Sequence, residues 1–128
     1  MSVRLDHTIV GARDKQASAE FLAEILGLPA PVRMGPFVAV RLDNGVALDF
    51  ADSGDDVRPQ HYAFALSDAE FDEAFGRIRS RGLEYWADPT RSRPGEIRQH
   101  DGSRGVYFQD PSGHFLEILT LTTEPEPR

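Results

Sequence analysis

The sequence contains no cysteine, and that absence excludes several kinds of site. Without thiols there is no disulfide, no zinc finger and no iron–sulfur cluster, so any metal must be held by imidazole and carboxylate groups. The chain also lacks an apolar run of about eighteen residues, which a membrane-spanning helix needs, and its first residues lack the layout of a secretory signal. We therefore expect a cytoplasmic protein with no membrane partner.

Positive charge is scarce, with 14 Lys and Arg against 21 Asp and Glu and a formal net charge of −7. Binding to a phosphate backbone needs clustered positive side chains, so we expect no nucleic-acid partner. The length of 128 residues, with 40% hydrophobic and 27% charged residues, is typical of one soluble domain. We expect that domain to span residues 1–128 and to end in a frayed tail over residues 123–128.

The first half of the chain predicts a strand, a helix and a hairpin in that order. A β-rich run over Arg4–Val10 precedes apolar residues at helical spacing over Ala17–Leu26, and Gly27 is the expected helix stop. Two further β-rich runs, Phe37–Leu42 and Val46–Ala51, flank an Asn-Gly pair. That pair is the strongest short signal of a β-hairpin.

After a polar connector over Asp52–Pro59, the same order begins again. Tyr62–Leu66 predicts the second opening strand, and apolar residues at helical spacing predict a helix over Glu70–Arg81, with Gly82 as its stop. The segment Glu84–Gly95 combines aromatic residues with two prolines. We interpret it as a short strand and a proline-containing loop.

The two halves repeat at nearly constant spacing. His7 and His61 each precede an aspartate by seven residues, and the two helix stops lie 20 and 21 residues beyond these histidines. A period of about 54 residues present only twice does not fit a solenoid. We therefore predict an α+β fold of two βαβββ modules, over about residues 1–52 and 58–122.

The repeat places candidate metal ligands at equivalent positions. His7 and His61 lie on the opening strands, whereas Asp49 and Glu117 lie on the closing strands, each four residues after a glycine. A lone histidine on a strand is usually structural, but two equivalent histidines with two equivalent carboxylates favour one shared cleft. Glu117 stands between two aliphatic residues, where burying an unpaired carboxylate costs several kcal/mol, so it needs a cation or a donor.

At these residues the sequence resembles the vicinal oxygen chelate superfamily, which includes glyoxalase I, extradiol ring-cleaving dioxygenases and bleomycin-resistance proteins. The resemblance implies that His7, His61 and Glu117 form a metal triad. Two histidines and one carboxylate suit non-haem Fe(II) with open coordination positions. Asp49 matches the fourth ligand of glyoxalase I, where a glutamate stands, but its side chain is one methylene shorter.

The C-terminal segment from His100 to Glu117 also resembles the fingerprint of extradiol dioxygenases. Only the first position departs from that pattern, because Arg98 stands where a small or β-branched residue is expected. The resemblance implies that His100 is an acid/base histidine and that Tyr107 hydrogen-bonds the substrate. A loop histidine and a core tyrosine are the plainer alternatives. Asp49 stands where extradiol enzymes carry another histidine.

His114, in the same segment, is expected to be a turn or rim residue.

A narrower resemblance is to the proteins related to the dioxygenase of chartreusin biosynthesis, which remodels an aromatic polyketide. It is carried by the segments DNGVALDFAD, QHYAFALSDAEFD and GVYFQDPSGHFLEILT. Strand alternation gives independent support, because it places four alanines beside the ligands and leaves room for a broad, flat substrate. These alanines are Ala47, Ala51, Ala63 and Ala65. Close packing under a helix is the alternative reason for alanine there.

From these observations we expect a mononuclear Fe(II) dioxygenase that uses O₂ on an aromatic polyketide or other polycyclic phenolic substrate. Asp49 or His100 would act as base and Tyr107 as donor. One alternative is a glyoxalase-like isomerase or lyase with Zn²⁺, Ni²⁺ or Mn²⁺ and Asp49 as fourth ligand. Another is a metal-free resistance protein that binds a drug. The resemblance also implies a homodimer.

Overall fold

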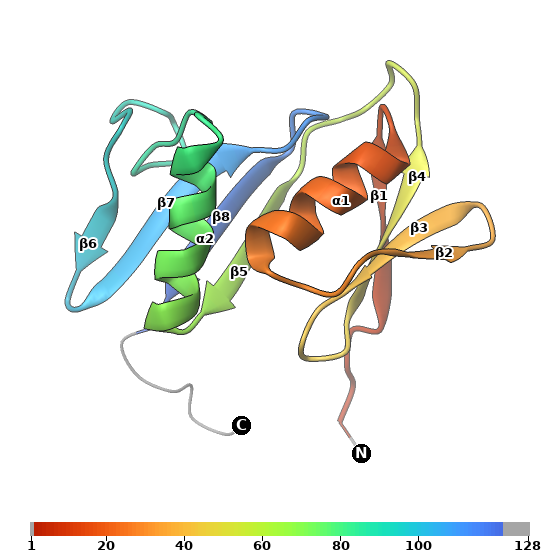
Figure 1. Cartoon of the computed structure of the whole chain (residues 1–128), viewed down its shortest axis with the longest axis horizontal. Helices are drawn as coiled ribbons and strands as arrows, with labels where there is room; N and C mark the ends of the chain where they lie inside the picture. Colours follow the sequence, from red (N-terminus) through yellow and green to blue (C-terminus); the bar gives the residue numbers. More distant parts are fainter. Residues whose placement is uncertain (1, 122–128) are drawn as a thin grey trace. The chain divides into compact units, whose positions relative to one another are not determined.

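The computed structural model describes residues 2–121, and Figure 1 shows their secondary structure. The chain divides into two compact units. The first comprises the residues up to Pro59 together with Asp110–Gly113, and the second comprises Gln60–Gln109 and the residues from His114 onward. The predicted tail over residues 123–128 lies outside the described residues.

The first unit contains one helix and a four-stranded sheet with the order β1-β4-β3-β2. Strand β1 is parallel to β4, and the other neighbours are antiparallel. Its elements are β1 (His7–Ala12), α1 (Lys15–Leu26), β2 (Val32–Met34), β3 (Phe37–Arg41) and β4 (Ala47–Asp52).

The second unit repeats this arrangement with the order β5-β8-β7-β6 and with β5 parallel to β8. Its elements are β5 (His61–Leu66), α2 (Asp68–Ser80), β6 (Arg98–His100), β7 (Ser103–Gln109) and β8 (Phe115–Thr120). Because strand order and direction agree between the units, the predicted α+β fold of two βαβββ modules is confirmed.

Both helices begin and end at recognisable caps. The Asp14 side chain accepts a hydrogen bond from the Ala17 N–H, so α1 begins at Lys15, two residues before the predicted start. It ends at Gly27, as predicted, where φ is +68°. In α2, Ser67 and Glu70 form a capping box, each side chain bonding the other residue's backbone N–H. The helix therefore begins before the predicted Glu70.

Alternation along the strands separates a core face from an open face in each sheet. In the second unit, Phe64, Val106, Phe108 and Ile118 are at most 8% exposed and lie on the face covered by α2. Residues between them in sequence therefore lie on the opposite face. The predicted strand alternation is confirmed.

Some boundaries differ from the sequence-based expectation. The opening strand runs from His7 to Ala12 rather than from Arg4, because its ladder with β4 starts at the pair His7 and Ala47. The predicted hairpin of β3 and β4 is present. Its connection is longer than a two-residue turn, since the strands end at Arg41 and resume at Ala47.

The segment Glu84–Gly95 does not form the predicted short strand. Trp86 makes only isolated bridges, to Pro94 and to Tyr107, because proline has no N–H with which to extend a ladder. The edge strand of this sheet is β6 instead. Asp88 organises the preceding loop by accepting hydrogen bonds from Thr90, Ser92 and Arg93.

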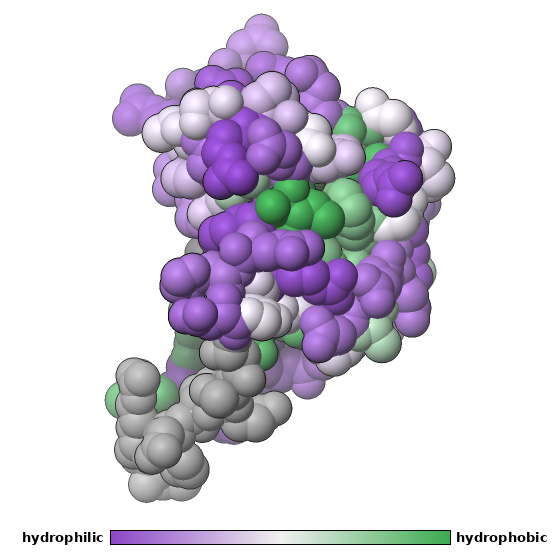
Figure 2. Space-filling model, turned by 90° about the vertical axis from the view of Figure 1, so that its left-hand side faces the viewer, coloured by the Kyte–Doolittle hydropathy of each residue, from purple (hydrophilic) through white to green (hydrophobic). Residues whose placement is uncertain are grey.

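Figure 2 views the side on which β6 lies in Figure 1 and shows mostly hydrophilic residues around a small hydrophobic area. Over residues 2–121, no helix is long and apolar enough to cross a membrane.

Candidate metal centre

The open face of the second sheet brings together three residues singled out in the sequence. Glu117 on β8 pairs with Ala63 on one side and with Tyr107 on the other. His61 is two residues before Ala63 and therefore shares this face with Glu117. The strand register thus places His61, Tyr107 and Glu117 around one point.

Glu117 is buried, at 6% exposure, and each of its carboxylate oxygens has a partner. Oε1 lies 3.2 Å from Nε2 of His61, and Oε2 accepts a hydrogen bond of 3.0 Å from Nη1 of Arg98. Two ligands about 2.1 Å from a common metal ion, at angles of about 90–110°, are about 3.0–3.4 Å apart. The separation of Nε2 and Oε1 therefore fits a pair of ligands on one ion.

Tyr107 packs against this pair. Its ring is stacked on that of His61, with centroids 5.6 Å apart and an interplanar angle of 28°. Burial raises the pKa of the Tyr107 hydroxyl, and the charge of Glu117 and a hydrogen bond to it raise the pKa further. The hydroxyl therefore stays protonated at neutral pH and can donate a hydrogen bond.

His7 and Asp49 form the corresponding pair in the first unit. The His7 Nδ1–H donates to Asp6 Oδ2 over 2.7 Å, and this bond, with a smaller contribution from Asp49, raises the pKa of His7. A histidine that ligates a metal through one ring nitrogen usually donates the other N–H to such a carboxylate. Asp49 pairs with Ile9, two residues after His7, as Glu117 pairs with Ala63, two residues after His61.

Each unit by itself supplies part of the predicted ligand set. Over the described residues 2–121, neither unit alone contains three His, Asp or Glu side chains grouped to hold a metal ion. His61 and Glu117 come from one unit, and His7 and Asp49 come from the other. The triad of His7, His61 and Glu117 stays a prediction, and its imidazole and carboxylate donors suit Fe(II), Zn²⁺ or Mn²⁺.

The other predicted site residue, His100, ends β6 and pairs with Ser103. Its side chain is 80% exposed, and its Nε2 lies 3.2 Å from Asp101. The β6 side chain that contacts Glu117 is that of Arg98. The acid/base role of His100 stays a prediction.

His114 lies in the core and not at a rim, which corrects the expectation. It is 2% exposed, its Nδ1 accepts a hydrogen bond of 2.9 Å from the Gln60 N–H, and its ring meets Tyr62 edge-on. This bond fixes the backbone immediately before His61. Sequence reasoning missed it because the contact joins residues 54 positions apart.

Among the four alanines, Ala63 and Ala65 are exposed, Ala51 is half-buried and Ala47 is buried. Alternation places the first two on the open face with Glu117 and the other two on the face with Asp49. The space beside Glu117 is therefore bordered by small side chains on β5.

The fold and these residues define a member of a known class. The chain belongs to the Glyoxalase/Bleomycin resistance protein/Dioxygenase superfamily, whose family model matches residues 4–118. Most members of this superfamily are metal-dependent enzymes. The resemblance inferred from the sequence is confirmed.

Individual relatives of known structure or sequence are similar to this chain over most of its length. The solved structure of Oxidase ChaP-H1 is 62% identical with a TM-score of 0.91, and the match covers 94% of this chain and 97% of that one. Oxidase ChaP-H2 is 60% identical with a TM-score of 0.91, covering 94% and 95%. The glutathione transferase FosA of Serratia marcescens is 29% identical over 121 residues, which is 89% of this chain and 78% of FosA.

Proposed function

We propose that the protein is a mononuclear Fe(II)-dependent dioxygenase that acts on an aromatic polyketide or a related polycyclic phenol. The observation that carries the proposal is the buried Glu117 carboxylate, one oxygen of which lies 3.2 Å from His61 Nε2. The similarity to two proteins named oxidases, at 60% and 62% identity, supports oxidation over isomerisation.

His7, His61 and Glu117 would hold the metal. Two histidines and one carboxylate leave coordination positions open for two vicinal substrate oxygens and O₂, and bound Fe(II) supplies the electron transfer to oxygen. The protonated Tyr107 hydroxyl, which is hydrogen-bonded to Glu117 in the structure, would donate instead to a substrate oxygen, and Asp49 or His100 would accept the substrate's phenolic proton. The small side chains of Ala63 and Ala65 leave room for a flat ring system.

Oxygen consumption tests this proposal directly. Protein loaded anaerobically with Fe(II) should consume O₂ in the presence of a polycyclic hydroxyquinone and more slowly with catechol. Protein loaded with Zn²⁺ should consume none. Equal oxygen consumption with and without the aromatic substrate would contradict the proposal.

A second candidate is a glyoxalase-like isomerase or a thiol transferase in which Asp49 is a fourth ligand. It is favoured by the position of Asp49, which pairs with Ile9 two residues after His7, and by the relation to FosA, which is named a glutathione transferase. This candidate predicts that Mn²⁺, Ni²⁺ or Zn²⁺ protein, without O₂, isomerises a glutathione adduct or adds the glutathione thiol to a second substrate. A metal-free drug-binding protein would instead bind the aromatic compound equally tightly before and after a chelator has removed any metal.

The family resemblance also leads us to propose a homodimer. Light scattering at micromolar concentration should give twice the chain mass of 14.2 kDa, and a monomer mass would contradict it.

A further inference from the structure

Arg98 reaches the buried Glu117 carboxylate from a neighbouring strand. It lies on the edge strand β6, two strands away from β8, and its Nη1 donates to Glu117 Oε2 over 3.0 Å. The Arg98 side chain is 35% exposed, whereas that of Glu117 is 8% exposed. The contact therefore joins a partly buried cation to a nearly buried anion.

A glycine on the intervening strand makes this reach possible. Arg98 pairs with Gly105 on β7, and Gly105 pairs with Leu119 on β8. A Cβ atom built on Gly105 would clash with Nη2 of Arg98 and would lie 2.6 Å from its Cζ. The guanidinium thus occupies the space beside Gly105 that the Cβ of any other residue would fill.

The contact divides the two oxygens of Glu117 between different partners. Oε2 accepts a hydrogen bond from Arg98, and Oε1 faces Nε2 of His61 at 3.2 Å. The Tyr107 hydroxyl also donates a hydrogen bond to the Glu117 carboxylate. A carboxylate can ligate a metal through one oxygen or through both. The charge-assisted hydrogen bond from Arg98 draws electron density from Oε2, so Oε1, beside His61, is the better metal ligand of the two oxygens.

We propose that Arg98, accommodated by Gly105, is a positioning residue that restricts Glu117 to one-oxygen metal ligation and so keeps a further coordination position open for substrate. This inference rests on the proposed role of Glu117 as a metal ligand. It also explains why an arginine stands where the extradiol fingerprint has a small or β-branched residue, because only a long side chain spans β7.

Infrared difference spectra of the whole protein, with Zn²⁺ minus without, test the inference without depending on activity. The frequency separation between the antisymmetric and symmetric carboxylate stretches is wide for one-oxygen ligation and narrow for two-oxygen ligation. The Glu117 bands are assigned as those lost in Glu117→Gln. We expect a wide separation in the wild type and a narrow one in both Arg98→Met and Gly105→Ala.

The two variants remove the contact by different routes. Arg98→Met deletes the charge, so Zn²⁺ should also bind several-fold more tightly, because a nearby positive charge is gone. Gly105→Ala keeps the charge but displaces the guanidinium, whose flexible end can move without disturbing the strand. Gly76→Ala, in open space on α2, is the matched control and should leave the Glu117 bands unchanged. Arg98→Lys keeps a positive charge, so the frequency separation of its Glu117 bands should lie between those of Arg98→Met and the wild type.

Two results would overturn different claims. If Arg98→Met and Gly105→Ala bind Zn²⁺ with the wild-type band separation, Arg98 does not restrict Glu117 and the positioning role is wrong. If the wild type binds Zn²⁺ with no band that depends on Glu117, the proposed metal role of Glu117 itself is wrong. Should Arg98→Met fail to fold, Gly105→Ala gives the same decision.

Discussion

At the residue scale, Glu117 shows which part of the site can be predicted from sequence. Alternation with Leu116 and Ile118 is enough to place its carboxylate on the opposite face, and the structure agrees, since those neighbours are 3% and 0% exposed. The contact with Arg98 could not be predicted, because it depends on the pairing of a three-residue edge strand and on the absence of a side chain at Gly105. In the extradiol dioxygenase fingerprint, Arg98 is recognisable only as a residue that does not match the pattern.

Ala63→Phe tests the space beside Glu117. Ala63 is exposed on the open face, so we expect the variant to keep its melting temperature and its metal. Compared with wild type, it should bind a polycyclic aromatic compound much more weakly and lose less affinity for catechol. Ala74→Phe is the control, since Ala74 is 1% exposed and overpacking there should destabilise the protein by about 1–3 kcal/mol. Unchanged binding of the polycycle by Ala63→Phe would show that the substrate lies elsewhere.

Asp49→Ala separates two roles of one carboxylate. As a base, Asp49 should be needed for turnover but not for metal binding. As a fourth ligand, it should be needed for both. We favour the base, because aspartate reaches less far than the glutamate of glyoxalase I. Metal content and oxygen consumption measured on the same sample distinguish the roles, and loss of iron equal to that in His7→Ala would favour the glyoxalase-like alternative.

At the scale of elements, the glycine that ends α1 and the hairpin of β3 and β4 were predictable, whereas the helix N-caps and the short edge strands were not. Gly27 ends α1 as predicted because its φ of +68° suits glycine. Strands β2 and β6 have three residues each, too few to show a period of two, and every residue of β2 is exposed. Their pairing with β3 and β7 is set by tertiary contacts rather than by a local pattern.

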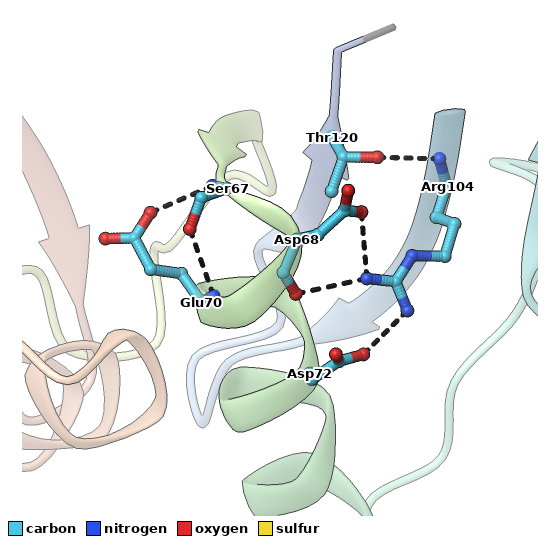
Figure 3. A network of polar contacts seen from close by, with 6 residues as sticks. All are labelled: Ser67, Asp68, Glu70, Asp72, Arg104 and Thr120. Carbon is cyan, nitrogen blue, oxygen red and sulfur yellow. Dashed lines mark hydrogen bonds and ion pairs between the residues drawn. The ribbon is translucent and has the colours of Figure 1, made fainter. Parts of the chain in front are cut away.

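Arg104 on β7 donates hydrogen bonds to side chains of α2, as Figure 3 shows. Its guanidinium bonds the Asp72 carboxylate at 2.7 Å and the Asp68 carboxylate at 3.1 Å, and lies 4.4 Å from the ring centroid of the buried Phe71. We expect Arg104→Met to lower the free energy of unfolding by about 1–2 kcal/mol, from partly exposed ion pairs and a cation–π contact. Urea denaturation measures this change.

The matched control for that prediction is Arg77→Met, which removes an exposed i,i+4 pair with Glu73 on the same helix. It should cost less than about 0.5 kcal/mol. Equal costs for the two variants would mean that Arg104 does no more than a surface ion pair.

The hydrogen bonds that Asp88 accepts predict that part of the protein's stability depends on pH. Hydrogen bonds from Ser92 and Thr90 lower the pKa of the Asp88 carboxyl far below its ordinary value of about 3.8. Its contribution to stability is therefore fully present above about pH 4 and is lost as the pH falls toward the folded-state pKa. The melting temperature of wild type should exceed that of Asp88→Asn at neutral pH, and the difference should shrink below about pH 4. A difference that stays constant down to pH 2 would contradict this assignment.

At the scale of the whole molecule, the doubled pattern of histidine, helix stop and carboxylate was sufficient to predict two βαβββ modules. The sequence did not predict that residues 110–113 group with the first unit. There the Ser112 hydroxyl accepts a hydrogen bond of 3.0 Å from the Arg13 N–H and lies 3.0 Å from the Ser18 hydroxyl. Such contacts between distant residues leave no local periodicity.

The central claim is that one metal ion is held by His7, His61 and Glu117. The most direct measurement is the iron content of anaerobically purified protein, determined for wild type and for His7→Ala, His61→Ala and Glu117→Ala, with Ala63→Ser as control. We predict about one iron per chain in wild type and control, and loss of iron in each of the other three. Full iron occupancy in folded His61→Ala would contradict the proposed metal centre.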